Sequence, residues 1–197
     1  RDGSLSARVE LDGAARAGTE VAIAVPDAAL TLRGRTDGSG VAQLKAQPKR
    51  LRRWSPEDPY LHSVTVRAAG DAIGDRIGFR TVEVRGRQIV LNGEPLFLRG
   101  ISLHEEAIGP VANRNITEAG ARALLAEAQA LNANFVRLAH YPHSEITTRL
   151  ADELGLLVWA EIPVYWSIAF EEAETLSLAR RMLAEMIERD RNRASVV

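Results

Sequence analysis

The chain has 197 residues, of which 46% are hydrophobic and 26% are charged, and its formal net charge at pH 7 is -1. This balance excludes an intrinsically disordered chain, and the near-equal numbers of basic and acidic residues (25 and 26) indicate neither a nucleic-acid nor a membrane-surface partner. Cysteine is absent, which excludes disulfides and thiol nucleophiles, and no apolar run approaches the roughly 18 residues of a membrane span.

The first part of the chain has the pattern of an all-β domain. Apolar and polar residues alternate in short runs separated by Gly, Pro and Asp, including residues 5–11, 21–25, 61–66 and 73–84. The segment Asp37-Gly38-Ser39-Gly40 between two such runs is a hairpin-turn signal. Short strands with frequent turns favour an antiparallel arrangement, and we expect an immunoglobulin-like β-sandwich over residues 1–85.

From about residue 95, strand-like and helix-like patterns take turns. Apolar runs at 96–101, 135–139 and 156–159 are each followed by apolar residues at helical spacing. Thr117 and Ser144 are expected to cap two of these helices, and Gly155 to end the second. The β-α-β-α-β-α-β order predicts a parallel sheet with right-handed crossovers.

Such an order opens either a dinucleotide-binding sheet or a TIM (β/α)8 barrel. No glycine-rich phosphate loop follows the first strand, which favours the barrel. Residues 86–197 are about half of what a barrel needs, so we expect its N-terminal portion only. The chain starts at Arg1 and stops at Ser195-Val196-Val197, which resembles the opening of a strand, so we expect an internal fragment of a longer protein.

Polar side chains follow each of the three predicted strands. They are His104 and Glu105, then His140 and Tyr141, then Glu161, Tyr165 and Trp166. Because chemistry in parallel α/β folds lies at the carboxyl ends of strands, we expect these side chains to meet at one rim.

Arg137 stands inside an apolar strand, where an unpaired guanidinium would be costly. We therefore expect a buried carboxylate partner. That partner is either a catalytic acid across a barrel lumen or Glu161 in a simple salt bridge.

Each rim residue also has a structural explanation. His140 could bind a backbone carbonyl, and His104 with Glu105 could form a helix cap or loop contact. Tyr165 and Trp166 could pack a loop instead of forming a sugar platform.

His140 and His143 have the spacing of a metal pair. Pro142 lies between them and disfavours a helical His-x-x-His face. A metal bound by this pair is therefore not expected.

Seven segments, taken in order and spacing, resemble glycoside hydrolase family 2, the β-galactosidase and β-glucuronidase group. They are residues 54–61 (WSPEDPYL), 78–84 (GFRTVEV), 91–95 (LNGEP), 99–105 (RGISLHE), 134–142 (NFVRLAHYP), 156–163 (LLVWAEIP) and 188–197 (ERDRNRASVV). The ordered set is specific, although each motif alone is weak.

The resemblance implies a retaining β-glycosidase of the β-galactosidase or β-glucuronidase type, with two Glu residues about 5–5.5 Å apart as acid/base and nucleophile. In the family both lie beyond the part that this chain matches, so we expect no catalytic carboxylate here and no hydrolysis by the chain alone. The resemblance also implies that Arg137 supports the nucleophile and that His104 and His140 line the sugar subsite. Glu161 and Trp166 are the remaining expected substrate-binding or supporting residues.

The sequence departs from the family pattern at Leu103, Ala160 and Arg193-Ala194. The family's magnesium ligands have no counterpart after Glu161, so we expect no metal, and we expect no cofactor. The partner that the resemblance implies is a β-linked saccharide or glycoside, and we expect no nucleic acid and no membrane. We also expect self-association, because half a barrel exposes a sheet edge and an apolar lumen.

Two other functions fit the same residues. A non-catalytic carbohydrate- or partner-binding module would bind sugar through Trp166, Tyr165 and His140 without turnover. An unrelated α/β enzyme would need Glu105 and Glu161 as its acid–base pair.

Overall fold

The computed structural model describes residues 3–14, 16–106 and 115–197, and the chain forms two compact units. The first unit comprises 1–52 and 61–77, and the second comprises 53–60 and 78–197. The predicted boundary at residue 85 does not coincide with this division. Residues 53–60 and 78–85 belong to the second unit.

The first unit consists of two antiparallel sheets, one of strand order β3-β2-β5-β6 and one formed by β1 and β4. Its elements are β1 (Leu5–Glu10), β2 (Glu20–Val25), the 3-10 helix η1 (Pro26–Ala28), β3 (Leu30–Arg35), β4 (Val41–Ala46), β5 (His62–Ala68) and β6 (Asp71–Ile77). In β2, Val21, Ile23 and Val25 are buried on one face, as the period of two in a strand requires.

The turn at 37–40 forms as predicted, but the strands on its two sides do not make a hairpin. The backbone N–H of Gly40 donates to the Asp37 carbonyl at 3.0 Å, and β3 and β4 then enter different sheets. A Cβ built on Gly34 in β3 would lie 2.4 Å from a methyl carbon of Leu44 in β4. The two strands thus pack face to face instead of pairing edge to edge.

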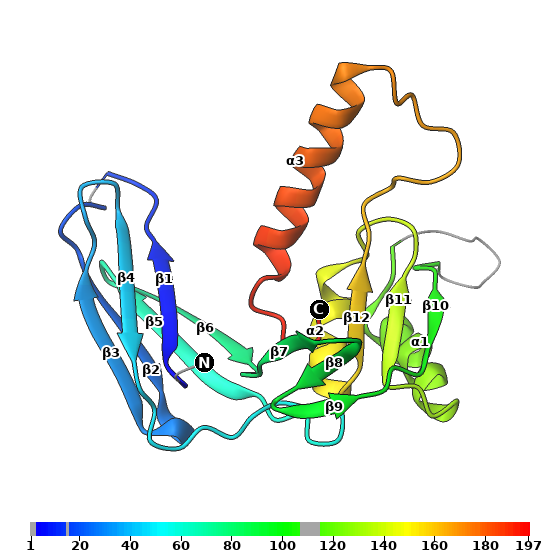
Figure 1. Cartoon of the computed structure of the whole chain (residues 1–197). Helices are drawn as coiled ribbons and strands as arrows, with labels where there is room; N and C mark the ends of the chain where they lie inside the picture. The colour runs from blue at the N-terminus through cyan, green and yellow to red at the C-terminus, as the bar shows by residue number, and fades with distance from the viewer. Residues whose placement is uncertain (1–2, 15, 107–114) are drawn as a thin grey trace. The chain divides into compact units, whose positions relative to one another are not determined.

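The second unit contains an antiparallel meander followed by a parallel three-stranded sheet with three helices (Figure 1). The meander is β7 (Val82–Arg85), β8 (Gln88–Leu91) and β9 (Glu94–Leu96); the rest is β10 (Gly100–Leu103), α1 (Glu118–Ala130), β11 (Phe135–Leu138), α2 (Glu145–Leu154), β12 (Leu157–Ala160) and α3 (Ala173–Asp190). A parallel bridge joins Val158 to Val196, so the chain after α3 runs beside β12. The predicted alternation of strands and helices is confirmed.

The helix boundaries follow from their capping residues. The Thr117 side chain accepts from the backbone N–H of Gly120, and Ser144 accepts from that of Ile146. Gly155 ends α2 at φ +73. A Cβ on Gly155 would also lie 2.4 Å from the Pro56 carbonyl oxygen, so both conformation and space require glycine there.

The segments 53–60 and 78–81 are held by contacts within the second unit. Trp54 is fully buried, and its indole N–H donates to the Asp152 carbonyl at 2.8 Å. A Cβ on Gly78 would lie 2.6 Å from the Ala194 side chain, and the Arg80 Nε donates to the Ala194 carbonyl. These contacts explain why the boundary between the units precedes residue 85.

The two faces of the parallel sheet differ in a way that positions the polar residues. One face packs against α1 and α2 through Leu125, Leu150, Val136 and Val158. The opposite face carries Ser102, Arg137 and Trp159, which lie in register across β10, β11 and β12. None of the helices in the described part of the chain is long and apolar enough to cross a membrane.

Candidate functional site

The candidate site lies where the three parallel strands end. His104 follows β10, His140 follows β11, and Glu161 follows β12. Because the strands are parallel and adjacent in the order β10-β11-β12, their carboxyl ends reach the same edge of the sheet. The structure thus brings these predicted residues to one rim, with Arg137 at the end of β11.

Arg137 and Glu161 form a two-pronged ion pair. The Arg137 Nε donates to Glu161 Oε1 at 2.6 Å, and Nη2 donates to Oε2 at 3.1 Å. The predicted carboxylate partner of Arg137 is therefore Glu161, although the guanidinium is not buried: its side chain is 40% exposed and that of Glu161 is 17% exposed. The Arg137 hydrogen bonds lower the pKa of Glu161 and in turn raise the pKa of Arg137, so both groups are charged near neutral pH.

His140 extends this pair into a three-residue cluster. Its Nδ1 lies 3.2 Å from Arg137 Nη2 and 3.4 Å from Glu161 Oε2. In a neutral His140, Nδ1 accepts from Arg137 if the proton is on Nε2, and it donates to Glu161 Oε2 if the proton is on Nδ1. His140 thus contacts two charged side chains through Nδ1, and not the backbone carbonyl that the sequence left open as its partner.

Aromatic rings enclose His140 on two sides. The His104 ring meets it edge-on with centroids 5.1 Å apart, and Tyr165 stacks on it at 5.1 Å and 29°. Trp166 lies perpendicular to Tyr165 at 6.2 Å, is 94% exposed and has φ +62. Tyr165 is therefore engaged with the cluster, whereas the Trp166 indole projects into solvent.

Glu105 faces a different element from its neighbour His104. Its buried carboxylate accepts the backbone N–H of Ser144 at 2.8 and 2.7 Å and the Thr147 hydroxyl at 3.1 Å. The helix-cap reading is therefore confirmed for Glu105. The two carboxylates of the suggested acid–base pair bind separate elements: Glu105 binds α2, and Glu161 binds Arg137.

His143 is buried and points into the protein. Its Nε2 lies 2.9 Å from the Ala139 carbonyl oxygen, and burial lowers its pKa. Thus His140 Nδ1 contacts Arg137, and His143 Nε2 contacts a backbone carbonyl. Within residues 3–14, 16–106 and 115–197, no group of three or more His, Asp and Glu side chains could hold a metal ion.

Two residues on the same sheet face were missed by the sequence reasoning. Ser102 and Trp159 flank Arg137 in register, and Trp159 is 56% exposed. The signal for them is the period of two in a strand, since each stands two residues before its strand's rim residue, His104 or Glu161.

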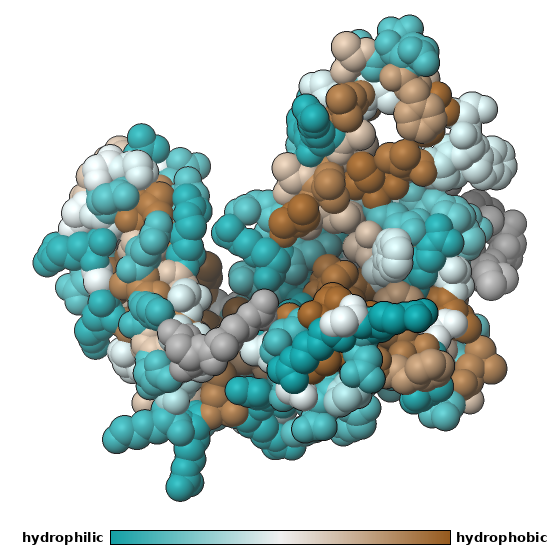
Figure 2. Space-filling model, viewed as in Figure 1, coloured by the Kyte–Doolittle hydropathy of each residue, from teal (hydrophilic) through white to brown (hydrophobic). Residues whose placement is uncertain are grey.

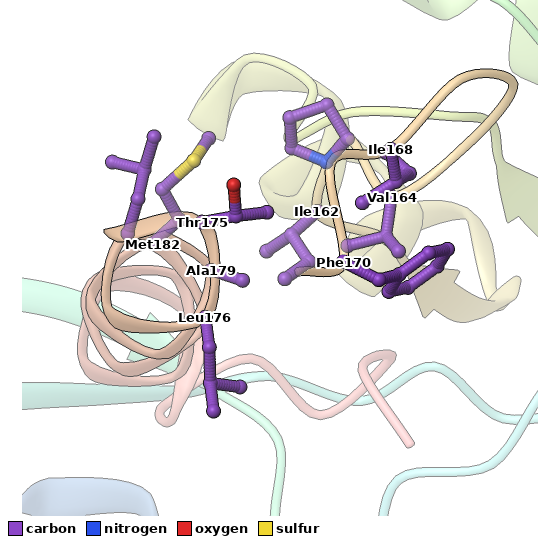
Figure 3. Close-up of a pocket in the computed structure, with 10 residues that line it drawn as sticks. Ile162, Val164, Ile168, Phe170, Thr175, Leu176, Ala179 and Met182 are labelled. Carbon is purple, nitrogen blue, oxygen red and sulfur yellow. The ribbon is translucent and has the colours of Figure 1, made fainter. Parts of the chain in front are cut away.

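An apolar cavity of about 550 Å³ lies between the segment after Glu161 and the first half of α3 (Figure 3). Its lining is Ile162, Pro163, Val164, Ile168, Phe170, Thr175, Leu176, Leu178, Ala179 and Met182. Hydrophobic side chains continue along the exposed surface of α3 (Figure 2), where Leu183 and Ile187 are 42% and 58% exposed.

Comparison with known proteins identifies what this arrangement is similar to. The family model described as "Glycosyl hydrolases family 2, TIM barrel domain" matches residues 82–197. A β-galactosidase of Thermoanaerobacter pseudethanolicus is 38% identical over 147 residues, which are 71% of this chain and 19% of that protein. A putative β-glucuronidase of Formosa agariphila is 34% identical over 152 residues, 73% of this chain and 18% of that protein. The chain thus spans about a fifth of the length of these relatives.

Solved structures agree with the sequence matches. The apo structure of Bacteroides uniformis β-glucuronidase 3 superposes with a TM-score of 0.82 and 32% identity, covering 100% of this chain and 26% of that one. A Ruminococcus gnavus β-glucuronidase in complex with D-glucuronic acid gives a TM-score of 0.80 and 25% identity over 99% of this chain and 33% of that one.

Proposed function

This chain belongs to glycoside hydrolase family 2, and we propose that the protein containing it is a retaining β-glycosidase of the β-galactosidase or β-glucuronidase type. The observation that carries the proposal is the Arg137–Glu161–His140 cluster at the carboxyl edge of a parallel sheet. The names of the similar proteins, β-galactosidases and β-glucuronidases, support the same reaction class.

In this proposal Arg137 supplies a fixed positive charge. Glu161 uses both oxygens to hold Nε and Nη2, so the guanidinium plane has one orientation. A preoriented cation stabilises negative charge without reorganising during the reaction. We assign Arg137 to the support of the nucleophilic carboxylate of the whole enzyme.

His140 and His104 would bind the sugar. The Nε2 of the neutral His140 ring is free of the cluster that Nδ1 contacts, and it donates to a sugar hydroxyl oxygen when Nδ1 accepts from Arg137, or accepts a sugar hydroxyl when Nδ1 donates to Glu161. The His104 and Tyr165 rings hold that imidazole from two sides. None of these groups is the acid/base or the nucleophile, which we place outside this chain.

Trp166 fits a platform for a sugar or leaving group. An indole that is 94% exposed, on a backbone at φ +62, is an unusual position for a large apolar residue. Aromatic faces pack against the apolar faces of ligand rings. Such a platform would also serve a non-catalytic binding module, which the assay below separates from an enzyme.

The fold is part of the proposal. We assign the first unit to an immunoglobulin-like sandwich, supported by its two antiparallel sheets and the face-to-face contact of Gly34 with Leu44. We assign the parallel part of the second unit to the first three β/α units of a (β/α)8 barrel. The bridge from Val158 to Val196 supports a fourth strand there.

The test uses the protein that contains this chain at its full length, with aryl β-galactoside and aryl β-glucuronide as substrates and the α-anomers as controls. We expect release of the aryl group from a β-anomer only. The Arg137→Ala variant should lower kcat/KM by about 10²–10³-fold, comparable to the removal of one preorganised charge-stabilising group. Saccharide binding without turnover would instead establish the binding module.

A further inference from the structure

His143 stands three residues after His140 in the chain. It is 3% exposed, and its ring lies 5.2 Å from that of Tyr141. Its Nε2 is 2.9 Å from the Ala139 carbonyl oxygen, and its own carbonyl accepts from Arg189 Nη1 at 2.9 Å. A carbonyl oxygen only accepts, so the His143 proton sits on Nε2 in this contact.

This contact completes the anchoring of the residue that precedes His140. The backbone N–H of Ala139 donates to the Leu103 carbonyl of β10 at 2.9 Å, and its C=O accepts from His143. Ala139 is bonded directly to His140, so hydrogen bonds at both its N–H and its C=O restrict the backbone where the chain reaches His140. The direction in which the His140 side chain leaves the backbone is thereby restricted.

The surroundings of His143 are consistent with a neutral donor. Burial lowers its pKa, and the charged or titratable groups that act on it are Glu105, His104 and Arg189. A neutral imidazole has one N–H, which the Ala139 carbonyl occupies. The one N–H of a neutral His143 is therefore already used within the protein.

We propose that His143 is a positioning residue, whose Nε2–H holds the Ala139 carbonyl and thereby keeps the His140 imidazole against Arg137 and Glu161. The inference rests on the proposed function only in the assignment of His140 to sugar binding. The positioning itself is measured without turnover, so a failure of the glycosidase assignment and a failure of this inference are distinguishable.

The experiment is NMR of the histidine imidazoles in the isotopically labelled chain, at about pH 8, where an ordinary imidazole is neutral. The chain has four histidines, and His62 in the other compact unit serves as an unaffected reference. The indole N–H of Trp54, buried in the same unit as His143 and donating to the Asp152 carbonyl, reports intact folding of that unit. The two matched variants are His143→Gln, whose side-chain amide can donate to Ala139, and His143→Phe, which keeps an aromatic ring but has no donor.

The expected result is that His140 in the wild type is a single tautomer, held by the contacts of its Nδ1 with Arg137 and Glu161. His143→Phe should shift the His140 signals and introduce the second tautomer, whereas His143→Gln should restore the wild-type pattern, with the Trp54 indole signal unmoved in both. Unchanged His140 signals in His143→Phe, or equal perturbation by Phe and Gln, would overturn the proposal. The wild type provides a test that needs no variant: an Nδ1–H tautomer at His143 would also refute it.

Discussion

The commitment of Glu105 to α2 leads to a quantitative prediction for Glu105→Ala. The buried carboxylate accepts from the Ser144 N–H and from the Thr147 hydroxyl at the start of α2. Each of these two donors would lose its acceptor, which costs about 1–3 kcal/mol per donor. Since water entering the emptied site recovers part of this, we expect the free energy of unfolding to fall by about 2–3 kcal/mol.

The measurement is urea unfolding followed by tryptophan fluorescence. All three tryptophans, Trp54, Trp159 and Trp166, lie in the second unit, so their emission reports the unit that contains Glu105. The matched control is Glu106→Ala, which removes the same charge from the next, exposed residue and should cost no more than about 0.5 kcal/mol. Equal effects of the two substitutions, or a Glu105→Ala effect below about 0.5 kcal/mol, would refute the reasoning.

Three further predictions concern acid stability, a glycine and activity. Because Arg137 lowers the pKa of Glu161, this carboxylate stabilises the folded chain fully above its ordinary pKa of 4.5 and loses that effect as the pH falls through its lower folded pKa. The free energy of unfolding, measured from pH 6 down to about 2, should therefore fall less steeply in Glu161→Gln than in the wild type. Gly155→Ala should destabilise the second unit by more than Gly86→Ala, which should cost about 1 kcal/mol. Both glycines have positive φ, but only at Gly155 would a Cβ lie 2.4 Å from the Pro56 carbonyl oxygen. Thermal unfolding of the two variants measures the difference. The 197-residue chain alone should release no product from aryl β-glycosides, and turnover by a preparation shown by mass spectrometry to hold no longer species would contradict the placement of both reactive carboxylates outside it.

The candidate site shows how far local patterns extend. The ends of the three strands could be located from apolar runs, and this placed His104, His140 and Glu161 at one rim. The expectation that Arg137 needs a carboxylate rests on the cost of an isolated charge in a strand and was confirmed by Glu161. Its degree of exposure was not foreseen, because exposure depends on what covers the sheet face opposite α1 and α2.

Neighbouring residues at the rim illustrate what local patterns leave open. His104 and Glu105 are adjacent in sequence, yet one meets the His140 ring and the other caps α2. Both side chains are polar, so the residue types do not show which of the two faces the site. The choice follows from the path of the backbone after β10, which is set by contacts with residues about 40 positions later.

The sequence by itself determined the order of strands and helices, the caps at Thr117, Ser144 and Gly155, and the family, because periodicity, capping and motif spacing are properties of short segments. Only the tertiary structure decided that 53–60 joins the second unit, that β3 and β4 enter different sheets, and that His143 holds the backbone before His140. Each of these depends on register and packing between segments distant in the chain, and a one-residue change in that register would exchange the faces to which the same side chains point.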